Sequence, residues 1–380
     1  MIDHMLSSDT HIIEPPDLWA SRVPPEFEDV APRVERVDGV DWWIVDGNRT
    51  LSFAGGAQTG ARFENADQLR TGATFEDVRS GGYEPAAHLA DGLTDGVFGS
   101  VLYPTEGLTL YRMSDSDALT VMCQAYNDWL AVFCEHDPER LKGVAMLNVD
   151  DVDVAVDELR RSAELGLAGG LIPTALAAGD RYDSPRFEPL WTAAEQLGMP
   201  LSLHLGANRG GVDEDFKEIR PTYFTVVDYW VKVSLADLIF SGVLDRHPGL
   251  RIGCIEHELG WIPHFLDRLD YTYTQRQGNQ AFPRLVSVDS PSELFRRNVF
   301  VSFQDDDLGI RERHTIGING LMWGSDYPHT ESTFPRSRQI MTDRLGDIPA
   351  DERSRITWGN AASIYGFSID ESQTAPEMER

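Results

Sequence analysis

The feature that most constrains the fold of this 380-residue chain is a series of eight short apolar segments, most of them followed by helical periodicity. Strands that are apolar along their whole length and alternate with helices are typical of a parallel sheet covered by helices. Eight such units favour an α/β fold closed as a (β/α)8 TIM barrel over an open, doubly wound sheet. The segments are residues 8–11, 97–103, 143–147, 170–173, 200–205, 251–257, 299–303 and 321–325.

A long excursion, residues 20–95, separates the first two predicted strands. Within it, the strand-like residues 40–45 and 50–53 flank Asp46-Gly47-Asn48, a sequence typical of a hairpin turn. We interpret the excursion as a small inserted β element that covers the barrel. Residues 1–367 would then form one barrel domain, and residues 368–380 a polar C-terminal tail.

Composition excludes several classes of partner. The chain has 33 basic and 62 acidic side chains, so its formal charge is 33 − 62 = −29. That charge argues against binding to nucleic acid or to an anionic membrane, and it leaves a small molecule as the expected substrate. No apolar run is long enough to span a bilayer, and the N-terminus does not resemble a signal peptide. The three cysteines predict a reduced, cytoplasmic protein, which we expect to be a homodimer or other oligomer.

Ionisable residues stand at the ends of four predicted strands. His11, His204 and His257 end or follow the first, fifth and sixth, and Asp326 follows the eighth. The carboxyl ends of all strands of such a barrel meet at one mouth, where the active site lies. Imidazoles and carboxylates that converge there form a suitable site for a divalent metal. No G-x-G-x-x-G or Walker A sequence supports a nucleotide cofactor.

The first strand carries two of the candidate metal ligands. Asp9 and His11 are two positions apart, so both can face the barrel axis, and Glu14 lies just beyond them on the rim. The alternative is that Asp9 and Glu14 cap a turn and that His11 is a hydrogen-bonded core residue. A lone histidine such as His204 is likewise often structural.

The sixth and eighth strands carry the candidate acid/base groups. Alternation along a strand allows either His257 or Glu256 to face inward, and we favour His257 as a ligand or general acid/base. Asp326 follows a buried apolar run, where a carboxylate needs a cation or a donor; its alternative role is a helix cap. His329 is a candidate for a second metal or for substrate. Three loop arginines are candidates to bind an anionic substrate: Arg62, Arg209 and Arg220.

Together these motifs resemble the amidohydrolase-2 family of the amidohydrolase superfamily, which includes the aminocarboxymuconate semialdehyde decarboxylase-like enzymes. The resemblance covers residues 5–367, and the motifs occur in order. They are Asp9-x-His11-x-x-Glu14-Pro15, Ser202-x-His204, the segment from Glu256 to Pro263, Gly324-Ser325-Asp326-Tyr327-Pro328-His329, Asn127-Asp128-Trp129 and Gly359-Asn360-Ala361-Ala362.

The resemblance implies a metal-dependent TIM barrel in which Asp9, His11, His204 and Asp326 bind the metal. It also implies that His257 is the general acid/base. Related zinc enzymes carry His-x-His in the first strand, whereas some decarboxylases carry Glu-x-His. The carboxylate of Asp9 is a harder ligand, which shifts the expected preference from Zn toward Mn or Fe.

Three functions remain open at this point. The first is a metal-dependent hydrolase or non-oxidative decarboxylase of a small carboxylated or carbonyl compound, with His257 and Asp326 as acid/base groups. The second is a dinuclear Fe or Mn/Fe oxygenase. The third is a non-catalytic scaffold or partner subunit. The residues available for a second metal or for supporting the first are Glu14, Glu256, His257 and His329.

Overall fold

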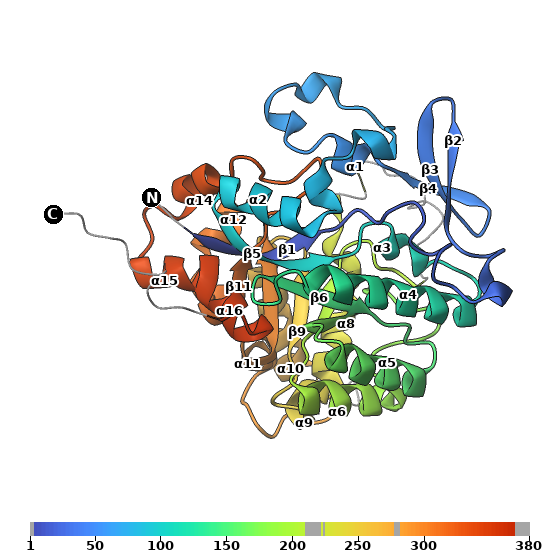
Figure 1. The fold of residues 1–380 in the computed structure, drawn as a ribbon. Helices are drawn as coiled ribbons and strands as arrows, with labels where there is room; N and C mark the ends of the chain where they lie inside the picture. Colours follow the sequence, from blue (N-terminus) through green and yellow to red (C-terminus); the bar gives the residue numbers. More distant parts are fainter. Residues whose placement is uncertain (1–3, 210–221, 223–224, 277–281, 369–380) are drawn as a thin grey trace.

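Eight parallel strands form one sheet, in which each strand pairs with the next one in the chain (Figure 1). The computed structural model describes residues 4–209, 222, 225–276 and 282–368. The predicted (β/α)8 barrel is confirmed, and each predicted apolar segment overlaps one strand. The strands are β1 (Met5–His11), β5 (Val97–Tyr103), β6 (Leu141–Met146), β7 (Gly169–Ile172), β8 (Leu201–His204), β9 (Ile252–Ile255), β10 (Val299–Phe303) and β11 (Leu321–Trp323).

The first strand, β1, lies beside the last, β11, and their contacts close the barrel. The backbone N–H of Asp326 donates to the carbonyl of Asp9 at 2.9 Å. The hydroxyl of Ser8 on β1 donates to the carbonyl of Trp323 on β11 at 3.0 Å. The same hydroxyl lies 2.8 Å from that of Ser302 on β10, so side chains meet across the barrel interior. This seam places residue 9 beside residue 326.

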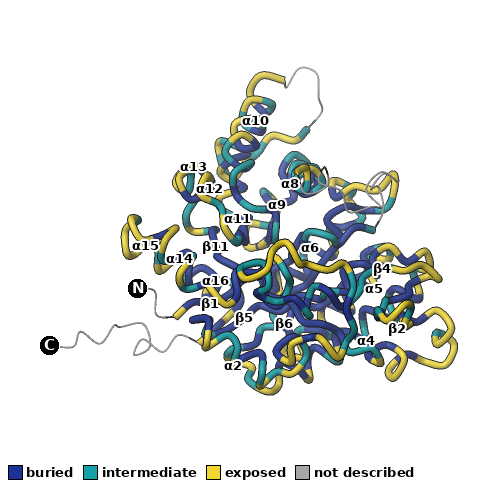
Figure 2. The backbone as a smooth tube through the Cα atoms, turned by 90° about the horizontal axis from the view of Figure 1, so that it is seen from above, coloured by how far each residue is buried: buried dark blue, intermediate teal, exposed yellow. Residues whose placement is uncertain are grey.

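Helices pack around the sheet and bury its outer face. Figure 2 shows the strands among the buried parts of the chain, whereas exposed residues lie on the outer helices and loops. The longer helices are α2 (Pro85–Asp95), α4 (Ser116–Cys134), α5 (Val152–Glu164), α6 (Glu188–Leu197), α8 (Asp228–Phe240), α10 (Ile262–Gln275), α11 (Pro291–Asn298) and α14 (Ser337–Leu345). Shorter ones are α1 (Ala54–Ala57), α3 (Gly107–Leu110), α9 (Val243–Arg246), α12 (Asp307–Arg311), α13 (Arg313–Ile316), α15 (Ala350–Ser354) and α16 (Asn360–Tyr365).

The excursion between β1 and β5 contains a separate antiparallel sheet of β2 (Arg33–Val37), β3 (Val40–Val45) and β4 (Asn48–Ser52) (Figure 1). The last strand begins at residue 48 and not at residue 50 as predicted. Asp46 and Gly47 alone make the turn. Their φ values are 50° and 75°, and positive φ at both central positions is what a two-residue hairpin turn of this kind requires. The ring of Trp43 packs 5.2 Å from that of Trp19, which fixes the sheet to the barrel.

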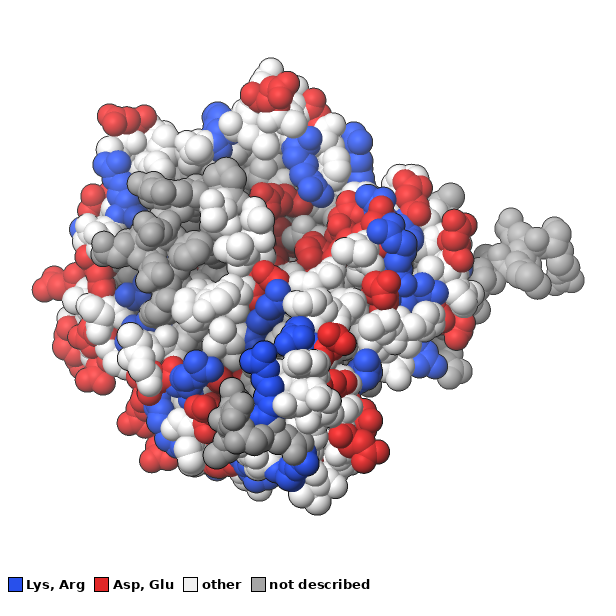
Figure 3. Space-filling model, turned by 180° about the vertical axis from the view of Figure 1, so that it is seen from behind, with Lys and Arg blue, Asp and Glu red and all other residues white. Residues whose placement is uncertain are grey.

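The surface agrees with the acidic composition. Figure 3 shows acidic and basic side chains interspersed over one face, with acidic groups prominent along its outline. Among the described helices, none is both long and apolar enough to cross a membrane.

Gly324 should be intolerant of any side chain, because it lies where β11 meets β1. A Cβ there would collide with Cβ of Asp9 and lie 2.7 Å from Oγ of Ser302. We expect Gly324→Ala to lower the free energy of unfolding by about 1–3 kcal/mol in urea denaturation. Gly359→Ala is the control, because its nearest neighbour would be the Ser354 carbonyl at 3.8 Å. Equal destabilisation of the two variants would contradict this packing argument.

Asp95 at the end of α2 should make stability depend on pH. It is buried and accepts a hydrogen bond from the Ser337 N–H at 2.9 Å, and burial raises its pKa from 3.8 to about 7. Between these values the folded chain holds a proton that the unfolded chain lacks. The stabilisation is therefore complete below about pH 4 and is lost as the pH rises to about 7.

The comparison that tests this uses Asp95→Asn, which cannot ionise. From pH 4 to pH 8 the free energy of unfolding of the wild type should fall relative to that of the variant by on the order of 2–4 kcal/mol. Asp157→Asn, at an exposed position, is the control and should show no such trend. A constant difference across this range would show that the Asp95 carboxyl keeps an ordinary pKa.

Candidate active site

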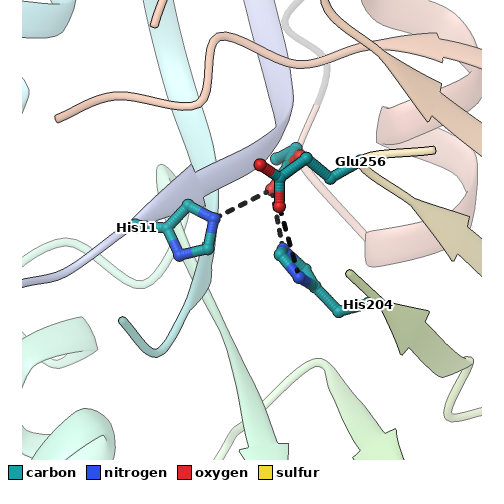
Figure 4. A group of neighbouring side chains, drawn as sticks. His11, His204 and Glu256 are labelled. Carbon is teal, nitrogen blue, oxygen red and sulfur yellow. Dashed lines mark hydrogen bonds and ion pairs between the residues drawn. The ribbon is translucent and has the colours of Figure 1, made fainter. Parts of the chain in front are cut away.

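Four side chains from three strands converge at the carboxyl end of the barrel. Asp9 and His11 lie at the end of β1, His204 ends β8, and Glu256 directly follows β9; their candidate ligand atoms all lie within 4.8 Å of one another. Figure 4 shows His11, His204 and Glu256 pointing toward one another. Oδ1 of Asp9 lies 3.3 Å from Nε2 of His204 and 3.5 Å from Nε2 of His11. The sequence prediction that residues about 200 positions apart become neighbours is met here.

A second group shares His11 with the first. Oδ1 of Asp326 lies 3.4 Å from Nε2 of His11, and Nδ1 of His329 lies 2.7 Å from the same oxygen. The His329 ring stacks on the His11 ring at a centroid distance of 4.0 Å. Asp326 is therefore part of the same centre. A helix-capping role does not explain its position.

Hydrogen bonds orient both imidazoles of the centre. Nδ1–H of His11 donates to the carbonyl of Pro104 at 2.8 Å, and Nδ1–H of His204 donates to the carbonyl of Leu205 at 2.8 Å. Because a carbonyl only accepts, these contacts place the ring protons on Nδ1 and leave lone pairs on Nε2. In both rings Nε2 faces the carboxylate of Asp9. Lone pairs that face a carboxylate in a buried site require a cation between them.

The electrostatics of two carboxylates, Asp9 and Glu256, also fit a cation. Burial would raise the pKa of Asp9, but protons on the facing nitrogens of His11 and His204 would outweigh burial and hold that pKa below its ordinary value; a cation in place of those protons would act in the same direction. Burial and then the charges of Asp326 and Asp9 raise the pKa of Glu256 well above its ordinary value. Oδ2 of Asp9 and Nε2 of His11 are buried and make no hydrogen bond to any described residue. The residues present therefore fit one bound metal ion, which would supply the missing positive charge.

The backbone after β9 explains why Glu256 enters the centre. Extended alternation ends at Ile255, and Glu256 has a φ of 64°, a left-handed conformation uncommon for a residue other than glycine. Glu258 and Asp326 share it, with φ of 53° and 57°. Such conformations concentrate at functional sites, where surrounding contacts hold them. Of the two predicted candidates, Glu256 joins the group of possible ligands, with its Oε2 3.6 Å from Nδ1 of His204, whereas the favoured His257 is not among them.

His257 is buried beside the centre. Neither ring nitrogen makes a hydrogen bond of regular geometry to a described residue. Burial, followed by the nearby His204, lowers the pKa of His257 to about 3, against smaller opposing effects from the Val227 backbone and Asp9. The imidazole is thus neutral, and it lies beside the centre as a candidate proton-transferring group.

Glu14 supports the centre from outside. Its carboxylate accepts the backbone N–H groups of Thr105, Glu106 and Gly107 at 3.1, 3.0 and 2.9 Å. These bonds fix the loop after β5, whose Pro104 carbonyl orients His11. Oε1 of Glu106 in turn accepts the hydroxyl of Thr50 on β4 at 2.6 Å. Through these contacts the inserted sheet is tied to the loop that positions His11, a candidate metal ligand.

Sequence reasoning missed the contribution of β5. Pro104 orients His11, and Thr105 lies 3.0 Å from Nε2 of His329 through its hydroxyl. The Tyr103 ring packs 4.8 Å from that of His204, and its hydroxyl lies 2.9 Å from that of Ser202. The sequence did indicate their position, because Tyr103 ends a predicted strand and Pro104 and Thr105 follow it directly. This indication was overlooked because none of them is a typical metal ligand.

The family model for amidohydrolases matches residues 104–367. This chain belongs to the amidohydrolase family. The match confirms the resemblance found in the sequence motifs. It covers the part of the barrel that supplies His204, Glu256 and Asp326.

Characterised relatives in the family are decarboxylases. The chain is 31% identical over 259 residues to gamma-resorcylate decarboxylase from Rhodococcus jostii, covering 63% of this chain and 74% of the relative. It is 24% identical over 311 residues to 2-amino-3-carboxymuconate-6-semialdehyde decarboxylase from Dictyostelium discoideum, covering 80% and 82%.

Solved structures share the fold. An amidohydrolase from Mycobacterium avium subsp. paratuberculosis matches with a TM-score of 0.78 at 20% identity, covering 96% of this chain and all of that one. Dihydroxybenzoic acid decarboxylase from Polaromonas, solved with bound manganese, matches with a TM-score of 0.62 at 18% identity, covering 97% and 98%.

Removing one imidazole from the centre should abolish metal binding. We expect His204→Gln, purified without chelator, to hold at least about tenfold less metal per chain than the wild type in elemental analysis, because a ligand is lost outright. His247→Gln is the control, because the His247 ring contacts Glu188 and Glu195 and belongs to neither group of candidate ligands. Unchanged metal content in His204→Gln would remove this residue from the ligand set.

Proposed function

We propose that this chain is a metal-dependent, non-oxidative decarboxylase that releases CO₂ from a small carboxylated aromatic compound. The observation that carries the proposal is the buried centre of Asp9, His11, His204 and Asp326 with the neutral His257 beside it. Decarboxylase relatives that span most of the chain support the reaction class. A non-catalytic scaffold would have no need for so many buried ionisable groups.

The proposed metal ligands are those predicted from the sequence, Asp9, His11, His204 and Asp326, with Glu256 as an additional oxygen donor. Three carboxylates and two imidazoles form a hard ligand set, which suits a divalent Mn or Fe ion. Zn is selected more often by sites with soft ligands such as thiolates. The manganese bound to the Polaromonas enzyme agrees with that preference. Such an ion, when bound, would hold the substrate carboxylate or a neighbouring oxygen and withdraw charge from it.

Geometry favours one metal over two. The two groups of candidate ligands share His11, whose only free lone pair is on Nε2 because Nδ1 donates to Pro104. The single lone pair on Nε2 of His11 can bind one ion, so His11 cannot bridge two. Glu14 is occupied by three backbone N–H groups, so it is not available for a second ion. These contacts argue against the dinuclear oxygenase and assign Glu14 and His329 supporting roles.

Decarboxylation breaks the bond between the carboxylate and the ring and leaves an electron pair on the ring carbon, which must take up a proton. Two groups could deliver that proton. His257 has free ring nitrogens beside the centre. Asp326 accepts a hydrogen bond from Nδ1–H of His329 at 2.7 Å, and His329 in turn contacts the Thr105 hydroxyl. We assign His257 as the acid/base: its neutral imidazole must first take up a proton, which it then donates to the ring carbon as CO₂ leaves, and it returns to the neutral form.

Recognition of the substrate's charge would depend chiefly on the metal. Arg209, a predicted anion-binding residue, is already paired with Asp150, its Nε lying 2.8 Å from one carboxylate oxygen. Arg62 packs over the Phe63 ring at 4.5 Å. Arg220 lies outside the described residues.

Two other expectations remain proposals. Cys123, Cys134 and Cys254 are buried free thiols, which fits a reduced, cytoplasmic compartment. A homodimer or other oligomer is expected by analogy alone.

Loss of His257 should abolish turnover without loss of metal. We expect the wild type to release CO₂ from at least one member of a panel of hydroxylated benzoates without consuming oxygen. His257→Ala should be slower by about 100-fold or more with unchanged metal content. His314→Ala, at an exposed position, is the control.

Each alternative result has a distinct meaning. Metal loss in His257→Ala would make His257 a ligand and contradict its acid/base role. Oxygen uptake would favour the oxygenase. Hydrolysis of esters or amides by the wild type without any CO₂ release would overturn the decarboxylase proposal.

A further inference from the structure

A basic pocket lies at the amino-terminal end of the barrel strands, the end opposite to the metal centre. It is formed by the segments that enter β8, β9, β10 and β11 and by α16. Its volume is about 660 Å³, within the range of about 300–1,000 Å³ that holds small ligands. Its polar side chains are Arg251, Arg296, Arg297, Arg355, Asn298, Asn319, Asn360 and Ser363. We call this the arginine pocket.

The charge of the arginine pocket is opposite to that of the protein. The lining contains four arginines and no aspartate or glutamate, in a chain with 62 acidic and 33 basic residues. Acidic and basic groups are mixed over the face seen in Figure 3. A pocket without a carboxylate is therefore a local departure from the composition, and its positive potential would attract anions within about 10 Å at ordinary ionic strength.

The guanidinium groups are held in place by neutral acceptors. Nη1 of Arg251 donates to the carbonyl of Arg297, and Nη1 of Arg355 donates to the Asn319 side-chain oxygen at 2.5 Å. Nε and Nη2 of Arg296 both donate to the carbonyl of Thr315, at 3.1 and 2.9 Å. These bonds orient the side chains without cancelling their charges.

None of the four arginines forms an ion pair with a carboxylate in the described part of the chain. Arg297 is partly compensated, because Asp245 is close enough for Arg297 to help lower its pKa. Arg251 and Arg355 each make a single hydrogen bond there, which leaves donors free on both guanidinium groups. Arginine forks match the geometry of phosphate and carboxylate oxygens.

We propose that the arginine pocket binds a small multivalent oxyanion, separate from the substrate of the metal centre. Pyrophosphate and citrate are suitable probes because they present several phosphate or carboxylate oxygens in a volume that fits. If pyrophosphate binds more tightly than citrate, the pocket prefers phosphate oxygens; if citrate binds more tightly, it prefers carboxylate oxygens.

The test is calorimetric titration of each probe into the full-length, metal-loaded protein at fixed ionic strength. The double variant Arg251→Gln/Arg355→Gln should bind the preferred probe at least tenfold more weakly than the wild type. The matched control is Arg33→Gln/Arg49→Gln, which removes the same charge from exposed positions of the inserted sheet. A circular dichroism melt establishes that each variant is folded, and Arg296→Gln alone provides a second variant.

Three results would overturn the proposal. They are no binding of either probe by the wild type at millimolar concentration, equal weakening in the control, or unchanged binding in both arginine-pocket variants. The last result would place the probe outside the arginine pocket.

The anion could also come from the chain itself, since the sequence after α16 carries Asp370, Glu371, Glu377 and Glu379. A variant that ends at Ser368 separates the two sources. If the shortened chain binds the probe more tightly than the full chain, and Arg251→Gln/Arg355→Gln removes that gain, the pocket takes the chain's own carboxylates. If binding is the same in both lengths, the ligand is a free anion. Both results support an oxyanion site.

Discussion

The structure depends on the meeting of three carboxylates and two imidazole lone pairs in one buried space. Asp9, Glu256 and Asp326 would repel one another there, and His11 and His204 present acceptors rather than donors. Such a set is unfavourable by several kcal/mol without a compensating cation. The fold opposes this cost by closing the barrel through contacts that do not involve the metal, chiefly the hydrogen bonds between β1 and β11.

A second layer of residues decides how the ligands present themselves. Glu14 fixes the loop after β5, this loop fixes the tautomer of His11, and Thr50 of the inserted sheet holds Glu106 in the same loop. The inserted sheet is therefore more than a cover, because it belongs to the chain of contacts that orients His11, a candidate metal ligand. Metal affinity in proteins depends on such outer contacts as well as on the ligands themselves.

The sequence predicted the barrel well, because short apolar segments and helical periodicity are local patterns that every (β/α) unit repeats. It also predicted that Asp9, His11, His204 and Asp326 would converge, since strands of a barrel end at one mouth. It could not place Glu256 and His257. Alternation holds only along extended backbone, and the chain turns to a left-handed conformation at Glu256. The arginine pocket was also not predicted, because its members lie on five separate segments.

What the sequence by itself determined is the inventory: eight strands, their order, and the acids and histidines at their ends. Periodicity and strand direction are enough for that, because both are properties of neighbouring residues. Only the tertiary structure decided which ring nitrogens face Asp9, that the Glu14 carboxylate accepts three backbone N–H groups, and that arginines far apart share one pocket. These outcomes depend on distances between segments that approach each other only after the barrel closes.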